Sequence, residues 1–219
     1  MQKLTTLGLL AVLAASMVLV AGCPGPSGGI TGAKYDTPEK CFDAAKKAAE
    51  AKDYKTFLSF FTPEFKQTMG GMMMVGVMIS TTVMLPQDDV GKQKLEEKKV
   101  ILKAHGVDVE KLDDLLTETG FKDAMGDEKK IKAALAKLGA KIKDLDGLLA
   151  KDLDRSTEPP DFMGTLAEVK IEGDNATGVV TTEKEVEKYG QQVKEAEKMT
   201  MHFKKVSGGW LIDNLEVEE

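Results

Sequence analysis

The spacing of apolar residues divides the chain into a helical first part and a strand-forming last part. From residue 37 to about residue 155, apolar side chains recur every three or four positions, which is typical of amphipathic helices. After residue 163 they alternate with polar side chains, as in Ala167, Val169 and Ile171, which is typical of strands with one buried face. Helices followed by an antiparallel sheet predict an α+β fold.

Two Thr-Pro-Glu sequences mark helix starts, because threonine caps a helix, proline fits its first position and glutamate favours its first turn. The first, at residues 37–39, predicts a helix to about Ala51, and Asp53 can cap a short helix after it. The second, at residues 62–64, predicts the start of a third helix. The first two helices have apolar stripes at Cys41, Phe42, Ala45, Ala48 and Ala49, and at Tyr54, Phe57, Leu58 and Phe61.

Residues 67–87 carry no charge and contain six of the twelve methionines. Four interpretations are open: a helix buried inside the domain, a flexible wall of an apolar pocket, a surface that contacts a membrane or a partner, and a second membrane span. Gly70, Gly71 and Gly76 interrupt the segment and weaken the membrane-span interpretation. The candidate pocket-wall residues are Met69, Met73, Met78, Phe57, Phe61 and Trp210.

The charged segment 88–155 predicts helical hairpins that each have one apolar face. Ile131, Leu135 and Leu138, for example, follow the spacing of an amphipathic helix. His105 stands before a glycine, so we expect it at a helix C-terminus, where a cation is favoured, and not at a metal site.

A proline-containing break at residues 156–160 precedes the strands. Residues 183–197 are polar and are compatible with either an extended hairpin tip or a short helix. Ser207-Gly208-Gly209 predicts a hairpin turn before the last strand. Strands are expected near residues 167–171, 176–182, 199–204 and 210–217.

The first 22 residues have the order of a secretory signal peptide, with a positive start, an apolar core and small residues at the end. Val20-Ala21-Gly22-Cys23 resembles a bacterial lipobox. That resemblance implies cleavage between Gly22 and Cys23, followed by acylation of Cys23, and two or three acyl chains make attachment to a bilayer stable. The alternative is an uncleaved transmembrane helix. Residues 23–36 are rich in proline and glycine and predict a flexible tether.

The lipobox resemblance implies an exported protein that its acyl chains hold in the lipid bilayer of the cell envelope. Pro24, and not aspartate, follows Cys23, and by resemblance to known sorting rules this favours the outer membrane, facing the periplasm or the cell surface. Cys41 is then the remaining cysteine, and its apolar helical setting predicts a small buried residue.

Composition narrows the chemistry further. The formal net charge is -6, and loss of Lys3 with the signal peptide makes it -7, so nucleic acid is not an expected partner. The single arginine, Arg155, leaves almost no bidentate clamp for phosphates or carboxylates. Two histidines and two cysteines leave little for a metal site, and no phosphate loop or metal-ligand spacing is present, so no cofactor is expected.

Two segments of the chain resemble the nuclear-transport-factor-two-like (SnoaL-like, cystatin-like) superfamily. The first contains Asp53-Tyr54 between the two Thr-Pro-Glu sequences, and the second joins Met199–Val206 to Trp210–Asn214 through a glycine turn. The resemblance covers about residues 35–66 and 163–216. It implies N-terminal helices and a curved, cone-like antiparallel sheet in a single α+β domain over residues 37–219, with a large helical insertion at about 67–160.

Enzymes of that superfamily use an acid or a base inside the cone. His202 alternates with buried-type residues and is expected to face solvent, while Asp213 is expected to cap the sheet or bond a strand end. Tyr54 is expected to be a packed aromatic, and no pair of groups has a spacing that requires proton transfer. We therefore predict a non-catalytic, membrane-anchored lipoprotein that binds a small apolar ligand or an envelope protein. The alternatives are an isomerase or dehydratase that uses an acid in the cone, and a structural envelope protein.

Overall fold

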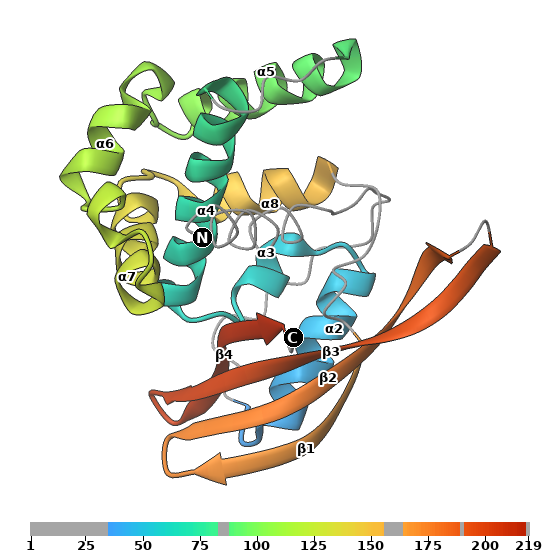
Figure 1. Ribbon diagram of the computed structural model, residues 1–219. Helices are drawn as coiled ribbons and strands as arrows, with labels where there is room; N and C mark the ends of the chain where they lie inside the picture. Colours follow the sequence, from blue (N-terminus) through green and yellow to red (C-terminus); the bar gives the residue numbers. More distant parts are fainter. Residues whose placement is uncertain (1–34, 83–87, 156–163, 189–190, 218–219) are drawn as a thin grey trace. The chain divides into compact units, whose positions relative to one another are not determined.

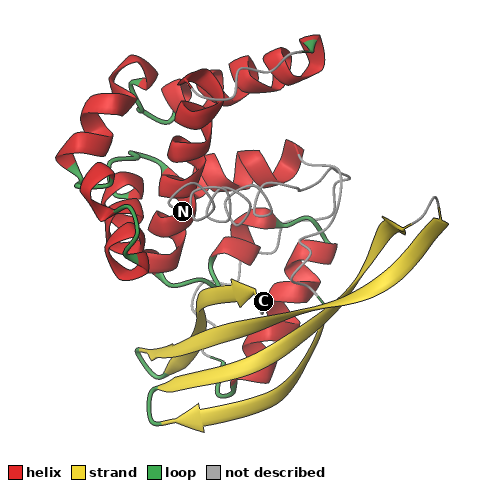
Figure 2. Cartoon of the chain, viewed as in Figure 1, coloured by secondary structure: helices red, strands yellow, loops and turns green. Residues whose placement is uncertain are grey.

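A computed structural model describes residues 35–82, 88–155, 164–188 and 191–217 of the 219-residue chain (Figure 1). The predicted α+β class is confirmed, with helices before and strands after residue 160 (Figure 2). The predicted signal peptide, Cys23 and most of the tether lie outside the described residues. The chain forms two compact units. A helical unit consists of residues 66–152, and a sheet unit combines residues 35–65 with residues 153–217.

The first two helices of the sheet unit begin where the capping residues predict. In α2 (Pro38–Glu50), the side chain of Thr37 accepts a hydrogen bond from the Lys40 amide at 3.3 Å. In α3 (Tyr54–Leu58), the Asp53 carboxylate accepts one from a first-turn amide at 3.1 Å. The buried residues of α2 include its whole predicted stripe, Cys41, Phe42, Ala45, Ala48 and Ala49.

Four strands form one open antiparallel sheet in the order β1-β2-β3-β4. They are β1 (Thr165–Glu172), β2 (Asn175–Lys188), β3 (Gln191–Val206) and β4 (Gly209–Val217). Helix α2 lies against β1 and β4 (Figure 1). Val180, Met201 and Phe203 of the sheet are buried. The predicted turn between β3 and β4 is confirmed, because Val206 pairs with Gly209 and both intervening residues have positive φ.

Residues 183–188 and 191–197 are paired strands, so the helix alternative for this segment is wrong. The pairing of β2 with β3 continues to Lys188 opposite Gln191, whereas β1 pairs with β2 only as far as Thr181. Strand β4 reaches β3 at Met199. Residues 182–188 and 191–197 therefore form a two-stranded ribbon, which we call the β2–β3 arm (Figure 2).

The helical unit is built from consecutive helices whose apolar faces meet in one core. Helices α4 and α8 each cross the division between the units, since α4 begins at Pro63 and α8 ends at Arg155. The helices are α4 (Pro63–Thr82), α5 (Asp89–Ala104), α6 (Leu112–Glu118), α7 (Glu128–Gly139) and α8 (Leu145–Arg155), with short 3-10 helices at Val109–Lys111 and Lys122–Ala124.

The methionine-rich segment is a continuous helix as far as Thr82, and residues 83–87 lie outside the described residues. Met73 and Met74 are buried in the helical core, which supports the buried-helix interpretation of this segment. The expectation that its glycines interrupt it is wrong. A Cβ atom on Gly71 would lie only 2.1 Å from the backbone oxygen of Leu135 in α7, so glycine allows the two helices to approach closely. Among the described helices, none combines the length and the apolar character that crossing a bilayer requires.

Candidate functional site

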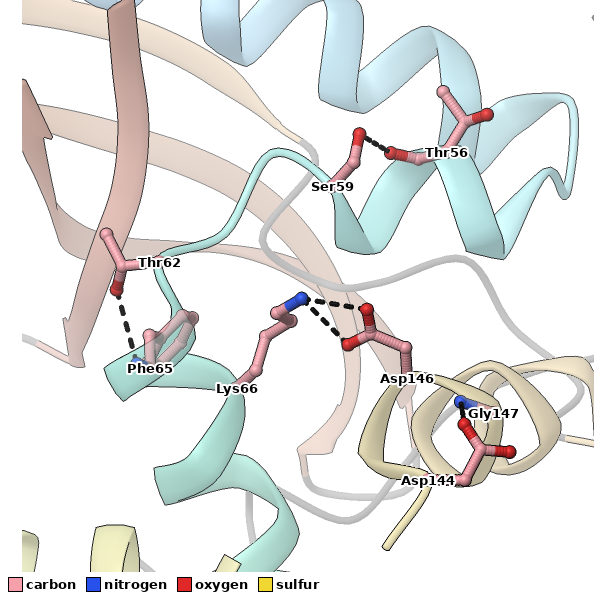
Figure 3. Close-up of polar contacts among 8 residues, drawn as sticks. All are labelled: Thr56, Ser59, Thr62, Phe65, Lys66, Asp144, Asp146 and Gly147. Atoms are coloured by element: carbon pink, nitrogen blue, oxygen red, sulfur yellow. Dashed lines mark hydrogen bonds and ion pairs between the residues drawn. The ribbon is translucent and has the colours of Figure 1, made fainter. Parts of the chain in front are cut away.

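A junction in the sheet unit ties the start of α4 to strand β4. Phe61 and Ile212 form a parallel bridge. The amide of Ile212 donates to the Phe60 carbonyl, and the amide of Thr62 donates to the Ile212 carbonyl, both at 2.8 Å. Thr62 is fully buried, and its hydroxyl caps α4 by accepting from the Phe65 amide at 3.2 Å (Figure 3).

Asp213 completes this junction. The β3–β4 register shifts here, because His202 pairs with Asn214 while Phe203 pairs with Ile212, which leaves Asp213 as the extra residue of a bulge. The Thr62 hydroxyl donates to the Asp213 carboxylate at 2.8 Å. Asp213 was expected to cap the sheet or to bond a strand end, and it instead bonds the threonine that caps α4. A carboxylate in this position stabilises the contact between helix start and strand.

His202 belongs to a polar group formed by neighbouring residues of β3 and β4. Its side chain is 32% exposed, and Nε2 lies 3.2 Å from Oε2 of Glu216. The two atoms are within ion-pair distance, but their alignment is not that of a hydrogen bond, and Nε2 is itself buried. The other carboxylate oxygen of Glu216 accepts from the Asn214 amide group at 2.8 Å. The expectation that His202 simply faces solvent is thus only partly correct, because a carboxylate shields one ring nitrogen.

Cys41 and Tyr54 are buried, and Tyr35 is partly buried. Burial raises the pKa of the Cys41 thiol to about 12, so at neutral pH it is protonated and a poor nucleophile. Burial also raises the pKa of Tyr54, with a smaller contribution from the negative charge of Asp154. Tyr35 was predicted to belong to the flexible tether, but its carbonyl accepts from the Trp210 amide at 2.9 Å. The tether prediction is therefore wrong for its C-terminal end.

The six predicted pocket-wall residues are divided between the two units, three in each. In the sheet unit, Phe57, Phe61 and Trp210 are at most 3% exposed, and the rings of Phe57 and Phe61 pack edge to face at 4.9 Å. In the helical unit, Met73 is buried and Met78 packs against the same core. Core packing accounts for the burial of these five side chains.

Polar contacts in the helical unit fix helix ends. Lys66 of α4 forms an ion pair with Asp146 of α8 at 2.7 Å, and Asp144 accepts from the Gly147 amide at 3.0 Å (Figure 3). His105 is the C-cap of α5, as its position before a glycine predicts, and its Nδ1 lies 3.1 Å from the Asp144 carboxylate. This histidine therefore joins the end of α5 to the start of α8.

The part of the chain that the structure describes has a surface depression but no cluster of metal ligands. The described residues contain no group of three or more histidine, cysteine or acidic side chains that could hold a metal ion. A surface depression in the helical unit is lined by residues of α7 and of the segment before it, among them Asp123, Lys130 and Lys137. It includes none of the predicted pocket-wall residues and neither Asp213 nor His202.

Comparisons with known proteins give no relative from which a function could be transferred: no family model, no curated protein and no solved structure matches this chain.

The β2–β3 arm is the segment for which the sequence was compatible with either a hairpin tip or a short helix. Its residues include Glu183, Lys184, Glu185, Lys194 and Glu195, and the register places Lys184 opposite Glu195 and Glu185 opposite Lys194. Opposite charges across a ladder favour that pairing. This complementarity is visible in the sequence and is the signal that could have identified the hairpin. Among the described strands, β1 pairs with β2 only as far as Thr181, and β4 pairs with β3 only from Met199.

Proposed function

We propose that the chain is an exported, lipid-anchored, non-catalytic protein that binds a protein partner in the cell envelope through the β2–β3 arm. The lipobox-like sequence at Cys23 supports the anchor. The arm is the observation that carries the binding role, because it extends beyond the pairing of the other described strands, and a strand edge presents backbone donors and acceptors that another strand can bind.

The packing of the two units supports protein binding over binding of a small apolar ligand. The aromatic residues considered for a pocket wall fill the interior of the sheet unit, and the buried methionines fill the core of the helical unit. A two-stranded ribbon is only marginally stable by itself. An arm of this length is therefore well suited to gain stability from a bound partner.

The anchor is tested by mass spectrometry of the protein purified from the envelope. We expect a chain that begins at residue 23 and carries acyl groups, and we expect the Cys23→Ser variant to lack them. Cys41→Ser is the matched control, which should be acylated like the wild type. A wild-type product that retains residues 1–22, or has a free thiol at Cys23, would contradict the anchor.

The binding role is tested by shortening the arm. Residues 183–196 are replaced by Asn-Gly, which joins the paired residues Thr182 and Glu197 through a tight turn and leaves the β1 and β4 ladders in place. Cross-linking in the intact envelope with a reagent that does not depend on the lysines removed with the arm should give protein adducts with the wild type that the shortened variant lacks. Identical adducts from both proteins would refute a binding role for the arm and favour a purely structural protein.

A further inference from the structure

Helix α7 and the residues just after it carry charge of one sign. Residues 129–143 contain six lysines and no acidic residue, although the whole chain has a formal net charge of -6. A solvated helix face usually mixes both signs of charge, so a cluster of one sign in an acidic protein indicates an interaction surface. All six side chains are exposed: Lys129, Lys130, Lys132, Lys137, Lys141 and Lys143.

Four of these lysines surround a row of short side chains on α7. Leu135 and Leu138 point the other way, into the helical core, and both are buried. Since residues three or four apart are neighbours on a helix, Ala133 lies beside Lys129, Lys130 and Lys137. Short residues between long flexible ones allow the charged ends to reach a flat surface together. We call this side of α7 the lysine face, and its residues are Lys129, Lys130, Lys132, Ala133, Ala136 and Lys137.

Acidic side chains neutralise only part of the lysine face. Lys130 forms an ion pair with Asp127 at 3.0 Å. Within the part of the chain that the structure describes, no acidic side chain forms an ion pair with Lys129, Lys132 or Lys137. At least three positive charges are therefore available to an external anionic group.

The surface depression of the helical unit borders this face. Lys130, Ala133 and Lys137 line it, and its volume is about 220 Å³. Asp123 in the depression and Glu128 at the start of α7 are the acidic residues closest to the lysines in this region, and both are exposed. The exposure of the lysines shows that the face is open to an external surface.

The composition of the lysine face favours a lipid surface over a protein partner. Lysine and alanine are depleted in protein interfaces, where aromatic residues, methionine and arginine are enriched. The face contains none of these enriched residues. Lysine attracts an anionic bilayer surface as a point charge and needs no fixed geometry to do so. Without a large apolar side chain on the face, we expect contact with headgroups and no insertion into the bilayer.

We propose that the lysine face of α7 binds the anionic headgroups of the bilayer to which the chain is anchored, and so holds the helical unit on the membrane surface. This inference rests on the lipid anchor of the proposed function, because acyl chains at Cys23 would keep the lysine face at high local concentration near the bilayer. The contact is electrostatic, so salt weakens it.

The test follows the lysine face in the acylated protein after reconstitution into vesicles. Ala133→Cys provides a thiol for a fluorescent label on this face, because Cys41 is buried and Cys23 would be acylated. The vesicles carry a headgroup quencher and consist of phosphatidylcholine alone or of equal parts phosphatidylcholine and phosphatidylglycerol. We expect strong quenching, reversed by salt, only with phosphatidylglycerol. Equal quenching in both kinds of vesicle, or none in either, would overturn the inference.

Removal of charge from the face gives the magnitude. Each lysine near an anionic surface strengthens binding about fivefold, so glutamine at positions 129, 132 and 137 should lower the ratio of docked to free helical unit about a hundredfold. Glutamine at the exposed positions 92, 94 and 103 of α5 is the matched control, since it removes the same charge from another helix of the unit. All variants should have the far-UV circular dichroism spectrum of the wild type. Equal losses in the two variants would assign the effect to overall charge and contradict a role of α7.

Arginine in place of the same three lysines separates a lipid surface from a protein partner. Attraction to headgroups requires only the charge, so the arginine variant should dock like the wild type. Loss of docking in this variant would indicate a site of fixed geometry and would refute the inference.

The two proposals fail in different ways. If mass spectrometry finds acyl groups at Cys23 but the label at position 133 does not respond to phosphatidylglycerol, the anchor stands and this inference is wrong. If the native protein carries no acyl groups, the proposed anchor is wrong, and the same quenching measurement with vesicles added to the free protein decides the inference by the same outcomes.

Discussion

The close approach of α4 and α7 gives a prediction that can be worked out from the structure. A Cβ atom on Gly71 would lie 2.1 Å from the backbone oxygen of Leu135, much closer than two such atoms can approach. On the neighbouring Gly70, a Cβ atom would meet the side-chain ends of Leu145 at 2.6 Å and Ile142 at 2.8 Å. Side-chain ends can rotate away, whereas a backbone oxygen moves only with its helix.

Gly71→Ala should therefore destabilise the helical unit much more than Gly70→Ala. Both substitutions gain about 1 kcal/mol of helix propensity. Overpacking against the backbone costs about 1–3 kcal/mol or more, and it applies chiefly to Gly71. We expect the two variants to differ by about 2 kcal/mol, which corresponds to roughly 4–8 °C in Tm for a chain of this size.

Thermal unfolding followed by far-UV circular dichroism measures this difference. Gly139→Ala approaches from the other helix, with its Cβ atom 1.9 Å from the Gln67 oxygen, and should behave like Gly71→Ala. If Gly71→Ala melts at the same temperature as Gly70→Ala, or above the wild type, the helices do not approach as described and the reasoning is refuted.

Three further predictions concern buried groups. Thr62→Val should lower the free energy of unfolding by about 1–3 kcal/mol in chemical denaturation, because it leaves Asp213 and the α4 cap without the hydroxyl, whereas Thr62→Ser should retain most of it. Burial raises the pKa of the Cys41 thiol from 9.0 to about 12. The contribution of the neutral thiol to the free energy of unfolding is therefore complete below pH 9 and is lost as the pH rises towards 12. Unfolding midpoints measured across this pH range should fall less steeply in Cys41→Ala than in the wild type. Met73→Lys should destabilise the helical unit by about 3 kcal/mol or more by placing a charge in its core, whereas Met125→Lys, at a 53% exposed position, should melt like the wild type.

Local signals in the sequence were enough to locate the helix starts. Thr37, Asp53 and Thr62 were identified as caps because a cap depends on a residue and the few positions after it. The hairpin turn at Ser207 was identified for the same reason. These features required no knowledge of distant parts of the chain.

Features that depend on distant partners were not predicted. The role of Gly71 depends on Leu135 in another helix, and the sequence alone could show only that a glycine interrupts an apolar pattern. The anchoring of Tyr35 depends in the same way on Trp210. The arm was left undecided because charged residues stand at consecutive positions of residues 183–188, so alternation of apolar and polar residues gives no signal there.

The bond between Thr62 and Asp213 joins positions 151 residues apart, so it bears on the order in which the chain can fold. Helical contacts within residues 66–152 are available as soon as that contiguous stretch has been synthesised. Residues 35–65, by contrast, must wait for β4, which follows the other described strands in the sequence, and contacts of such high contact order form slowly. Phe57 and Phe61 therefore remain exposed until β4 is available. A chaperone is expected to bind this early segment and not the helices of residues 66–152.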